Sequence, residues 1–344
     1  MGYFKIYVLS VLLIIACQGK DKRVHFTDVE IEEIFKDSLS IRAIELTGDR
    51  LFFACNKGAY GFVDLGSDEV TKHEVQYEDS YPEFRAVGHT SDALLMLSVA
   101  NPALLYKVRE FGEPELVYVE KDSMVFYDAM NFWNENEGIA MGDFMDGCLA
   151  IIITRDGGQT WNKLPCSVLP EPMEGEGAYA ASNTNISVIN DHTWIATSSM
   201  RIFYSPDKGV NWEVIQTPVI NGASAQGIYS IDFYDDKIGF AIGGDYTSPE
   251  YNAANKAITL DGGHSWHLIA ENQEPNYKSC VQFVPSSSGK GLVAVGFTGI
   301  SYSADQGLSW KKLSDEPLYT LRFLNDSLAY GAGQGRIVKL KFLQ

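Results

Sequence analysis

The sequence predicts an all-β fold, and three observations support this prediction. Its 344 residues include 18 Phe, 18 Tyr, 6 Trp and 31 Gly, a composition that favours strands joined by tight turns. A short pattern ending in Trp occurs four times, and its copies are spaced by about the length of one four-stranded sheet. We therefore expect a seven-bladed β-propeller of four-stranded antiparallel blades, closed by an N-terminal strand in the last blade.

Each copy of the pattern contains an Asp, a Gly two residues later and a Trp three residues after the Gly. The copies occupy residues 154–161, 205–212, 259–266 and 303–310, and their Asp residues are 51, 54 and 44 positions apart. The Asp carboxylate can accept backbone N–H groups inside a turn, the Gly can adopt positive φ, and the Trp can bury its ring between sheets. These roles are structural rather than catalytic. The residues assigned to them are Asp156, Gly158, Trp161, Asp207, Gly209, Trp212, Asp261, Gly263, Trp266, Asp305, Gly307 and Trp310.

These four copies resemble the BNR or Asp-box repeat, which is found in sialidases, sortilin-type receptors, oligoxyloglucan-cleaving hydrolases and photosystem II stability and assembly factors. The assembly factors are the most similar in repeat style and length, and the resemblance implies a scaffold rather than an enzyme. Those factors are expected to carry an arginine-rich patch for their partner. Because this chain has a net charge of −18, their specific role is not carried over.

The Asp boxes and looser strand echoes divide the chain into seven segments. The last of them has only three convincing strands, and we expect residues 26–34 to add its fourth and to cover the exposed sheet edges. The first two segments lack the box, so six or eight blades remain open as alternatives. The segments are residues 39–77, 84–120, 126–165, 179–216, 228–270, 278–313 and 318–342.

The N-terminus predicts an export signal. Lys5 precedes an uncharged run over residues 6–16, which is too short to span a bilayer comfortably, and Cys17 follows. This arrangement resembles the bacterial lipoprotein cleavage box, so residues 1–16 are read as a signal peptide and Cys17 as the lipidation site. An ordinary secretory leader is the alternative. Residues 17–24 form a polar tether, residues 25–344 form the propeller domain, and Gln18 favours the outer membrane by resemblance to the bacterial sorting rule.

The long loops opposite the Asp boxes form the candidate binding face. They are acidic and aromatic, which would suit a basic protein segment or a glycan in the cell envelope, whereas solvated loops without a ligand are the alternative. The excess of acidic residues argues against nucleic acid, and we expect a monomer. The candidate residues are Tyr81, Glu83, Glu171, Glu174, Glu176, Asp245, Tyr246, Glu250 and Tyr251.

The sequence contains no complete catalytic motif, so a non-catalytic binding protein is the preferred function. A glycoside hydrolase using two channel carboxylates is the alternative, and an oxidoreductase with an unrecognised cofactor is a weaker one. Arg42, Arg85 and Arg322 lie on expected first strands and could face the channel, or could serve only packing. The six His residues lack metal-site spacing, so we expect no metal and no cofactor.

Four cysteines follow Cys17. If the hairpin of the third segment pairs Thr154 with Thr160, the same register places Cys148 opposite Cys166, which predicts a disulfide in an oxidising compartment. Cys55 and Cys280 fall on separate segments and are expected to be buried thiols.

Overall fold

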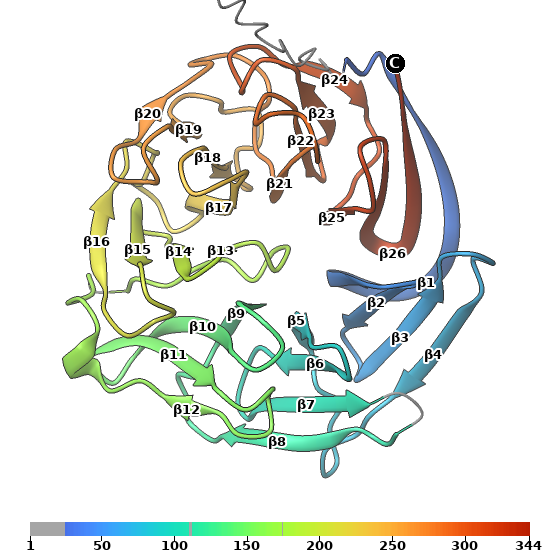
Figure 1. Ribbon diagram of the computed structural model, residues 1–344, viewed down its shortest axis with the longest axis vertical. Helices are drawn as coiled ribbons and strands as arrows, with labels where there is room; N and C mark the ends of the chain where they lie inside the picture. Colours follow the sequence, from blue (N-terminus) through green and yellow to red (C-terminus); the bar gives the residue numbers. More distant parts are fainter. Residues whose placement is uncertain (1–24, 110–111, 174) are drawn as a thin grey trace, which may run out of the picture.

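The computed structural model describes residues 25–109, 112–173 and 175–344, which form six antiparallel sheets arranged in a ring (Figure 1). We count each hydrogen-bonded sheet as one blade. The first blade has six strands, in the order β25-β26-β1-β2-β3-β4, and the other five have four strands each. The first-blade strands are β25 (Thr320–Phe323), β26 (Leu328–Leu343), β1 (Asp28–Thr47), β2 (Arg50–Cys55), β3 (Ala59–Asp64) and β4 (Val70–Glu74).

The remaining blades follow one another along the chain. The second blade contains β5 (Phe84–His89), β6 (Ala93–Ser98), β7 (Ala103–Arg109) and β8 (Glu115–Glu120), and the third contains β9 (Tyr127–Phe132), β10 (Gly138–Met145), β11 (Cys148–Thr154) and β12 (Asn162–Lys163). A 3-10 turn, Cys166–Val168, follows β12. The fourth blade contains β13 (Ile186–Ile189), β14 (His192–Ala196), β15 (Arg201–Ser205) and β16 (Glu213–Gln216). The fifth contains β17 (Gln226–Phe233), β18 (Gly239–Asp245), β19 (Lys256–Thr259) and β20 (His267–Leu268), and the sixth contains β21 (Cys280–Phe283), β22 (Leu292–Gly296), β23 (Gly299–Ser303) and β24 (Lys311–Ser314).

The prediction of seven four-stranded blades is wrong, because the structure has six blades, and no separate N-terminal strand closes a last blade. The single strand β1 pairs with β26 between Asp28 and Ser40 and with β2 between Ile41 and Thr47. The expected first and last blades are therefore fused into one six-stranded sheet. Residues 35–39 contain no Gly or Pro to end the strand, and register shifts absorb the bend instead.

The first strand of each four-stranded blade lies nearest the centre of the ring, and the fourth lies at the outside (Figure 1). Three of these inner strands, and the part of β1 that pairs with β2, have a register shift close to their beginning. The residue left unpaired by the shift is Arg42 in β1, Arg85 in β5, Asp128 in β9 and Tyr229 in β17. A bulge turns one extra side chain out of the regular alternation, so Arg85, Asp128 and Tyr229 lie near the start of their strands, and Arg42 lies near the start of the part of β1 that pairs with β2.

The Asp boxes join the third and fourth strands of the third to sixth blades. In the fifth blade, Asp261 accepts hydrogen bonds from Thr259 Oγ1 (2.8 Å), Ser265 N (2.9 Å) and Ser265 Oγ (2.6 Å). Thr259 Oγ1 also accepts the N–H of Gly263, whose φ is +89°. Equivalent contacts recur in the other three boxes, around Asp156, Asp207 and Asp305.

The tryptophan of each box fills the apolar core between its own blade and the preceding one. Trp161 lies in the core that the third blade shares with the second, together with Leu95 and Leu97. Trp212, Trp266 and Trp310 occupy corresponding cores farther round the ring. Burying a side chain of this size between two sheets contributes several kcal/mol, so the boxes hold neighbouring blades together as well as shaping turns.

Two of the described cysteines form a disulfide, and two are free thiols. Cys148 and Cys166 form a disulfide between the start of β11 and the turn after β12, whereas Cys55 and Cys280 are buried free thiols. The predicted signal peptide, the lipidation site Cys17 and the tether lie outside the described residues. Within the part of the chain that is described, no helix has the length and apolar character needed to cross a membrane.

Candidate functional site

The inner strands begin around a group of aromatic and basic side chains that we call the Tyr–Arg cluster. Its two arginines, Arg42 and Arg85, come from the bulges of β1 and β5. Its tyrosines come from the bulge of β17, from the segments before β13, β21 and β25, and from the loop after β18. They are Tyr179, Tyr229, Tyr246, Tyr277 and Tyr319.

The tyrosines contact one another in a chain of rings. Tyr179 stacks on Tyr229 with ring centroids 3.8 Å apart, and Tyr229 meets Tyr277 edge-on at 4.9 Å and Tyr246 edge-on at 6.5 Å. Tyr179 donates its hydroxyl hydrogen to the backbone carbonyls of Ser224 and Gln226, and Tyr229 donates to that of Ala225, so both rings are held at the beginning of β17. These contacts fix the rings in place, and rigid aromatic surface is well suited to binding.

Arg42 is the cationic centre of the cluster. Its guanidinium lies over the ring of Tyr319, 4.1 Å from the centroid, and burial together with the charge of Arg85 lowers its pKa. An arginine nevertheless stays protonated at neutral pH. Among the described residues Arg42 forms no ion pair and no hydrogen bond, and its buried Nε has no partner. Arg85, in contrast, is paired with Glu83 at 2.6 Å.

Asp128 lies at the equivalent bulge of β9 and is completely buried. Neither of its carboxylate oxygens has a hydrogen-bond partner among the described residues. Burial raises the pKa of Asp128 well above its usual range, and the neighbouring Asp143 adds to this rise. Burial also raises the pKa of Asp143. A completely buried carboxyl cannot reach a bound sugar, so this pair does not favour glycoside hydrolysis.

The residues expected to form an acidic binding face are placed differently from one another. Glu176 is completely buried and pairs with Arg201, which also donates to the backbone oxygen of Glu171 at 3.2 Å. Asp245 is buried and accepts hydrogen bonds from the amide and hydroxyl of Thr247. The carboxylates of Glu176 and Asp245 therefore stabilise the loops to which they belong. Glu174 lies outside the described residues.

The other expected face residues are more accessible. Tyr246 is 52% exposed and joins the Tyr–Arg cluster through Tyr229, whereas Tyr251 is 47% exposed and makes no ring contact among the described residues. Glu83 enters the cluster through its pair with Arg85. Tyr81 is 55% exposed, and Glu250 accepts a hydrogen bond from Asn276. The structure thus brings Glu83 and Tyr246 to one site and leaves Tyr81, Glu250 and Tyr251 outside it.

The opposite ends of the inner strands enclose a polar central cavity of about 250 Å³. Side chains there link β17, β21, β25 and β1 in turn: Phe283 N donates to Asp232 at 2.7 Å, Phe323 N donates to Gln282 at 3.3 Å, and Arg322 pairs with Glu45 at 3.3 Å. Burial raises the pKa of Asp232 to about 7, against the effects of the Phe283 N–H and of Arg322. These contacts close the ring, so we assign the cavity lining a structural role.

The Tyr–Arg cluster offers three groups for an anionic ligand. Besides the Arg42 guanidinium, the hydroxyls of Tyr277 and Tyr319 form no hydrogen bond with described residues. A guanidinium can bind a carboxylate through two parallel hydrogen bonds, and tyrosine hydroxyls can donate further ones. In the described residues no group of three or more His, Cys, Asp and Glu side chains is arranged to hold a metal ion.

Sequence reasoning found part of this site. It placed Arg42, Arg85 and Arg322 on inner strands, and the structure puts the first two in the cluster and Arg322 in the central cavity. It missed Tyr229 and Tyr319. The available signal was that each of these tyrosines lies within three residues of the start of an inner strand, at or beside the place where Arg42 and Arg85 occur.

The fold and the repeats define the class of protein, an all-β propeller with Asp-box repeats. The BNR/Asp-box repeat family model matches residues 152–163. A sequence search of curated proteins gives no match.

Solved structures share the fold at low sequence identity. A structure described as YCF48 bound to D1 peptide has a TM-score of 0.66 and 12% identity, covering 93% of this chain and 98% of that one. YCF48 from Cyanidioschyzon merolae has a TM-score of 0.59 and 12% identity, with 91% and 98% coverage. Streptogramin B lyase has a TM-score of 0.67 and 14% identity, with 92% and 98% coverage. At such identities the similarity establishes the propeller architecture alone.

Proposed function

We propose that this protein is a non-catalytic, lipid-anchored propeller of the bacterial cell envelope that binds an acidic segment of a protein partner at the Tyr–Arg cluster. The observation that supports this proposal most strongly is the unpaired guanidinium of Arg42, held over the Tyr319 ring at 4.1 Å. Arg42 is half-buried, with its Nε enclosed and without a hydrogen-bond partner, and an arriving carboxylate would supply that partner.

The surroundings of Arg42 favour a peptide. The stacked tyrosines offer apolar area with hydroxyl groups at the edges, the combination enriched at protein interfaces. Arg85 adds a second guanidinium close enough to influence the pKa of Arg42. A peptide with one carboxylate on Arg42 and apolar side chains against the rings would use both features.

A structural neighbour supports the peptide class. The structure described as YCF48 bound to D1 peptide shares the propeller fold of this chain, so one propeller of this shape is a peptide-binding protein. The acidic composition of this chain does not prevent the binding of an acidic segment, because the long-range field of exposed charges is screened beyond about 8 Å at physiological salt.

A peptide titration tests the proposal. A dye-labelled octapeptide of Ala, Asp, Glu and Leu with a free C-terminus is titrated with the full-length protein, and its counterpart with Asn and Gln is titrated in parallel. We expect the acidic peptide to bind at least tenfold more tightly and Arg42→Gln to remove most of that difference. Arg155→Gln, at an Asp-box turn where Arg155 pairs with Glu137, is the matched control. Equal affinity for both peptides, or unchanged binding by Arg42→Gln, would contradict the proposal.

The anchor needs a separate test. Export in a bacterial host with metabolic labelling by a radioactive fatty acid should label the wild-type protein in the membrane fraction, whereas Cys17→Ser should be unlabelled and released from membranes. Labelling that persists in Cys17→Ser would exclude this residue as the anchor, without affecting the peptide-binding proposal.

A further inference from the structure

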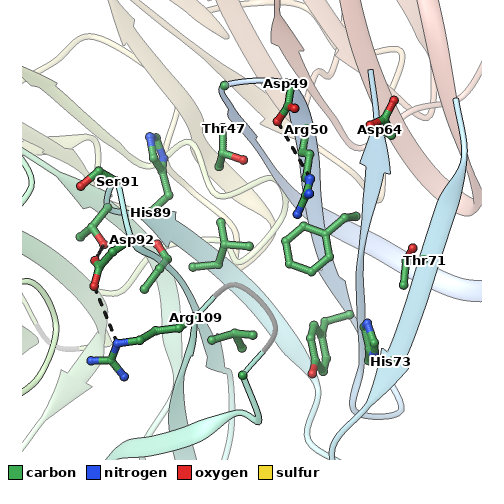
Figure 2. A pocket seen from close by; sticks show the side chains of 18 of the residues that line it. Thr47, Asp49, Arg50, Asp64, Thr71, His73, His89, Ser91, Asp92 and Arg109 are labelled. Carbon is green, nitrogen blue, oxygen red and sulfur yellow. Dashed lines mark hydrogen bonds and ion pairs between the residues drawn. The ribbon is translucent and has the colours of Figure 1, made fainter. Parts of the chain in front are cut away.

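A second site lies between the first and second blades, at the end of the inner strands where the Asp-box turns occur in other blades. It is a groove of about 920 Å³, which we call the blade 1–2 groove (Figure 2). Its lining comes from β1, β2, β3 and β4 on one side and from β5, β6 and β7 on the other. Apolar side chains that belong to the core between these blades form its floor, and they are Tyr60, Phe62, Leu94 and Val108.

The groove occurs where a box tryptophan is missing. Trp161, Trp212, Trp266 and Trp310 each lie in the core shared with the preceding blade. Two of them meet a phenylalanine edge-on, Trp161 with Phe132 at 6.0 Å and Trp266 with Phe233 at 5.9 Å. The second blade has no Asp box, and its core with the first blade contains no tryptophan. This interface therefore has aromatic walls and an open space at the edge that an indole closes elsewhere.

The rim of the groove is acidic. It has six carboxylates against the two arginines Arg50 and Arg109, and Arg109 is already paired with Glu115 at 2.9 Å and with Asp92 at 3.7 Å. Glu69 and Glu113 are exposed and form no hydrogen bond or ion pair through their carboxylates with described residues. The rim acids are Asp49, Asp64, Glu69, Asp92, Glu113 and Glu135. The other four acids already have partners: Asp49 pairs with Arg50, Asp92 with Arg109, and Asp64 and Glu135 accept hydrogen bonds from neighbouring loop residues. The two free carboxylates, Glu69 and Glu113, beside an apolar floor are complementary to a cation that accompanies an apolar group.

We propose that the blade 1–2 groove binds an aromatic side chain of a protein partner, flanked in that partner by lysine or arginine. The aromatic ring would lie beside Phe62, over which the Arg50 guanidinium lies 5.8 Å from the ring centroid, and the flanking cations would meet Glu69 and Glu113. A short segment suffices, because the volume of the groove accommodates one large side chain and its neighbours. This site is separate from the Tyr–Arg cluster, because it is lined by Thr47 and His89 at the last residues of β1 and β5, whereas Arg85 lies at the beginning of β5 and Arg42 at the beginning of the part of β1 that pairs with β2.

Peptide binding to the full-length protein tests this inference. The probe is a dye-labelled Gly-Lys-Trp-Lys-Gly peptide with blocked ends, followed by fluorescence anisotropy beside its Lys-Ala-Lys and Glu-Trp-Glu counterparts. We expect the Lys-Trp-Lys peptide to bind at least tenfold more tightly than either counterpart and its affinity to fall with rising salt. The double variant Glu69→Lys and Glu113→Lys should weaken binding at least tenfold, because both acids are exposed and unpaired. Thr71→Trp, on the wall of the groove, should block binding without changing the rim charge.

Two controls separate this site from general effects. Asp79→Lys reverses an exposed acid beyond the groove and should leave binding unchanged, and Arg42→Gln should affect only the acidic peptide of the Tyr–Arg cluster. Thermal unfolding of each variant establishes that it is folded. Absence of Lys-Trp-Lys binding, equal affinity for Lys-Ala-Lys, or unchanged binding by both the Thr71→Trp and the double Lys variants would overturn the inference. Binding of a neutral maltohexaose probe in place of the peptide would also overturn it.

Discussion

The third to sixth blades differ from the first two blades in how the apolar core between neighbouring blades is filled. In the former, an Asp box pins the outer turn and its tryptophan fills the core shared with the preceding blade. In the first and second blades there is no box, and the interface between them keeps a groove of about 920 Å³. The Asp-box repeat therefore closes the cores between blades, and the interface without it keeps an open groove.

The ends of the inner strands show the same division of roles. Toward the box end, side chains such as Asp232 and Gln282 bind the neighbouring inner strand and close the ring. Toward the other end, bulges present Arg42 and Arg85, and Arg42 has no hydrogen-bonding partner among the described residues. A group that satisfies a neighbour contributes to stability, whereas an unsatisfied buried group is a candidate for binding.

The largest difference between the two regions should come from truncating aromatic side chains. Trp266→Ala removes a buried indole from the core between the fourth and fifth blades, so we expect it to lower the free energy of unfolding by about 4 kcal/mol. Phe62→Ala, on the floor of the groove, should cost about 1 kcal/mol because this ring is only partly buried. Chemical denaturation measures both, and equal losses would show that the groove is as well packed as the box-bearing interface.

The second largest loss in the free energy of unfolding should come from breaking the disulfide of the third blade. It closes a sequence separation of 18 residues that includes the box turn, so breaking it should release loop entropy in the unfolded chain. We expect Cys148→Ser to lower the free energy of unfolding by about 3 kcal/mol. The double variant Cys148→Ser and Cys166→Ser should lose the same amount, which distinguishes the bond from an effect of one exposed thiol. A loss below 0.5 kcal/mol in both would contradict a stabilising role.

Asp232 should make stability depend on pH. Its pKa of about 7 in the folded protein exceeds the unfolded value near 4, so the folded state binds more protons between these limits. The contribution of Asp232 to the free energy of unfolding is fully present below about pH 4 and is lost as the pH rises to about 7. Because the side chain lines a cavity and is not fully excluded from solvent, we expect a loss of about 2 kcal/mol. Asp232→Asn can still accept the Phe283 N–H and should abolish this part of the pH dependence. An unchanged slope in urea unfolding between pH 4 and 7 would contradict it.

The smallest loss in the free energy of unfolding should come from substituting the carboxylate of an Asp box. Burial acts to raise the pKa of Asp261, but hydrogen bonds from Ser265 and Thr259 hold it below its usual value, so its stabilising contribution is present above about pH 4 and is lost as the pH falls. Asp261→Asn replaces one acceptor of the turn by a donor and should cost about 1 kcal/mol at pH 7, and less at pH 3. Asp79→Asn, which lacks such contacts, is the control. A loss that does not shrink at pH 3 would show that charge is not involved.

The repeats made the propeller predictable, because the Asp, Gly and Trp residues act within one hairpin and its neighbour. The number of blades was not predictable, since the continuity of β1 through residues 35–39 depends on pairing with β26, more than 290 residues away. The candidate site was predictable only in part. Loop composition identified Tyr246, but the assembly of Arg42 with Tyr277 and Tyr319 depends on the ring bringing the β1 bulge next to the segments before β21 and β25, which are distant in sequence.

Hydrogen–deuterium exchange of the full-length protein, with and without saturating acidic octapeptide, tests the central claim most directly. The claim is that the cluster end of the propeller binds ligand while the box turns are structural. We predict slower exchange at residues 41–43, 84–86, 277–279 and 318–320, and unchanged exchange at residues 205–212 and 259–266. Slower exchange at the box turns, with none at the beginnings of the inner strands, would contradict the account.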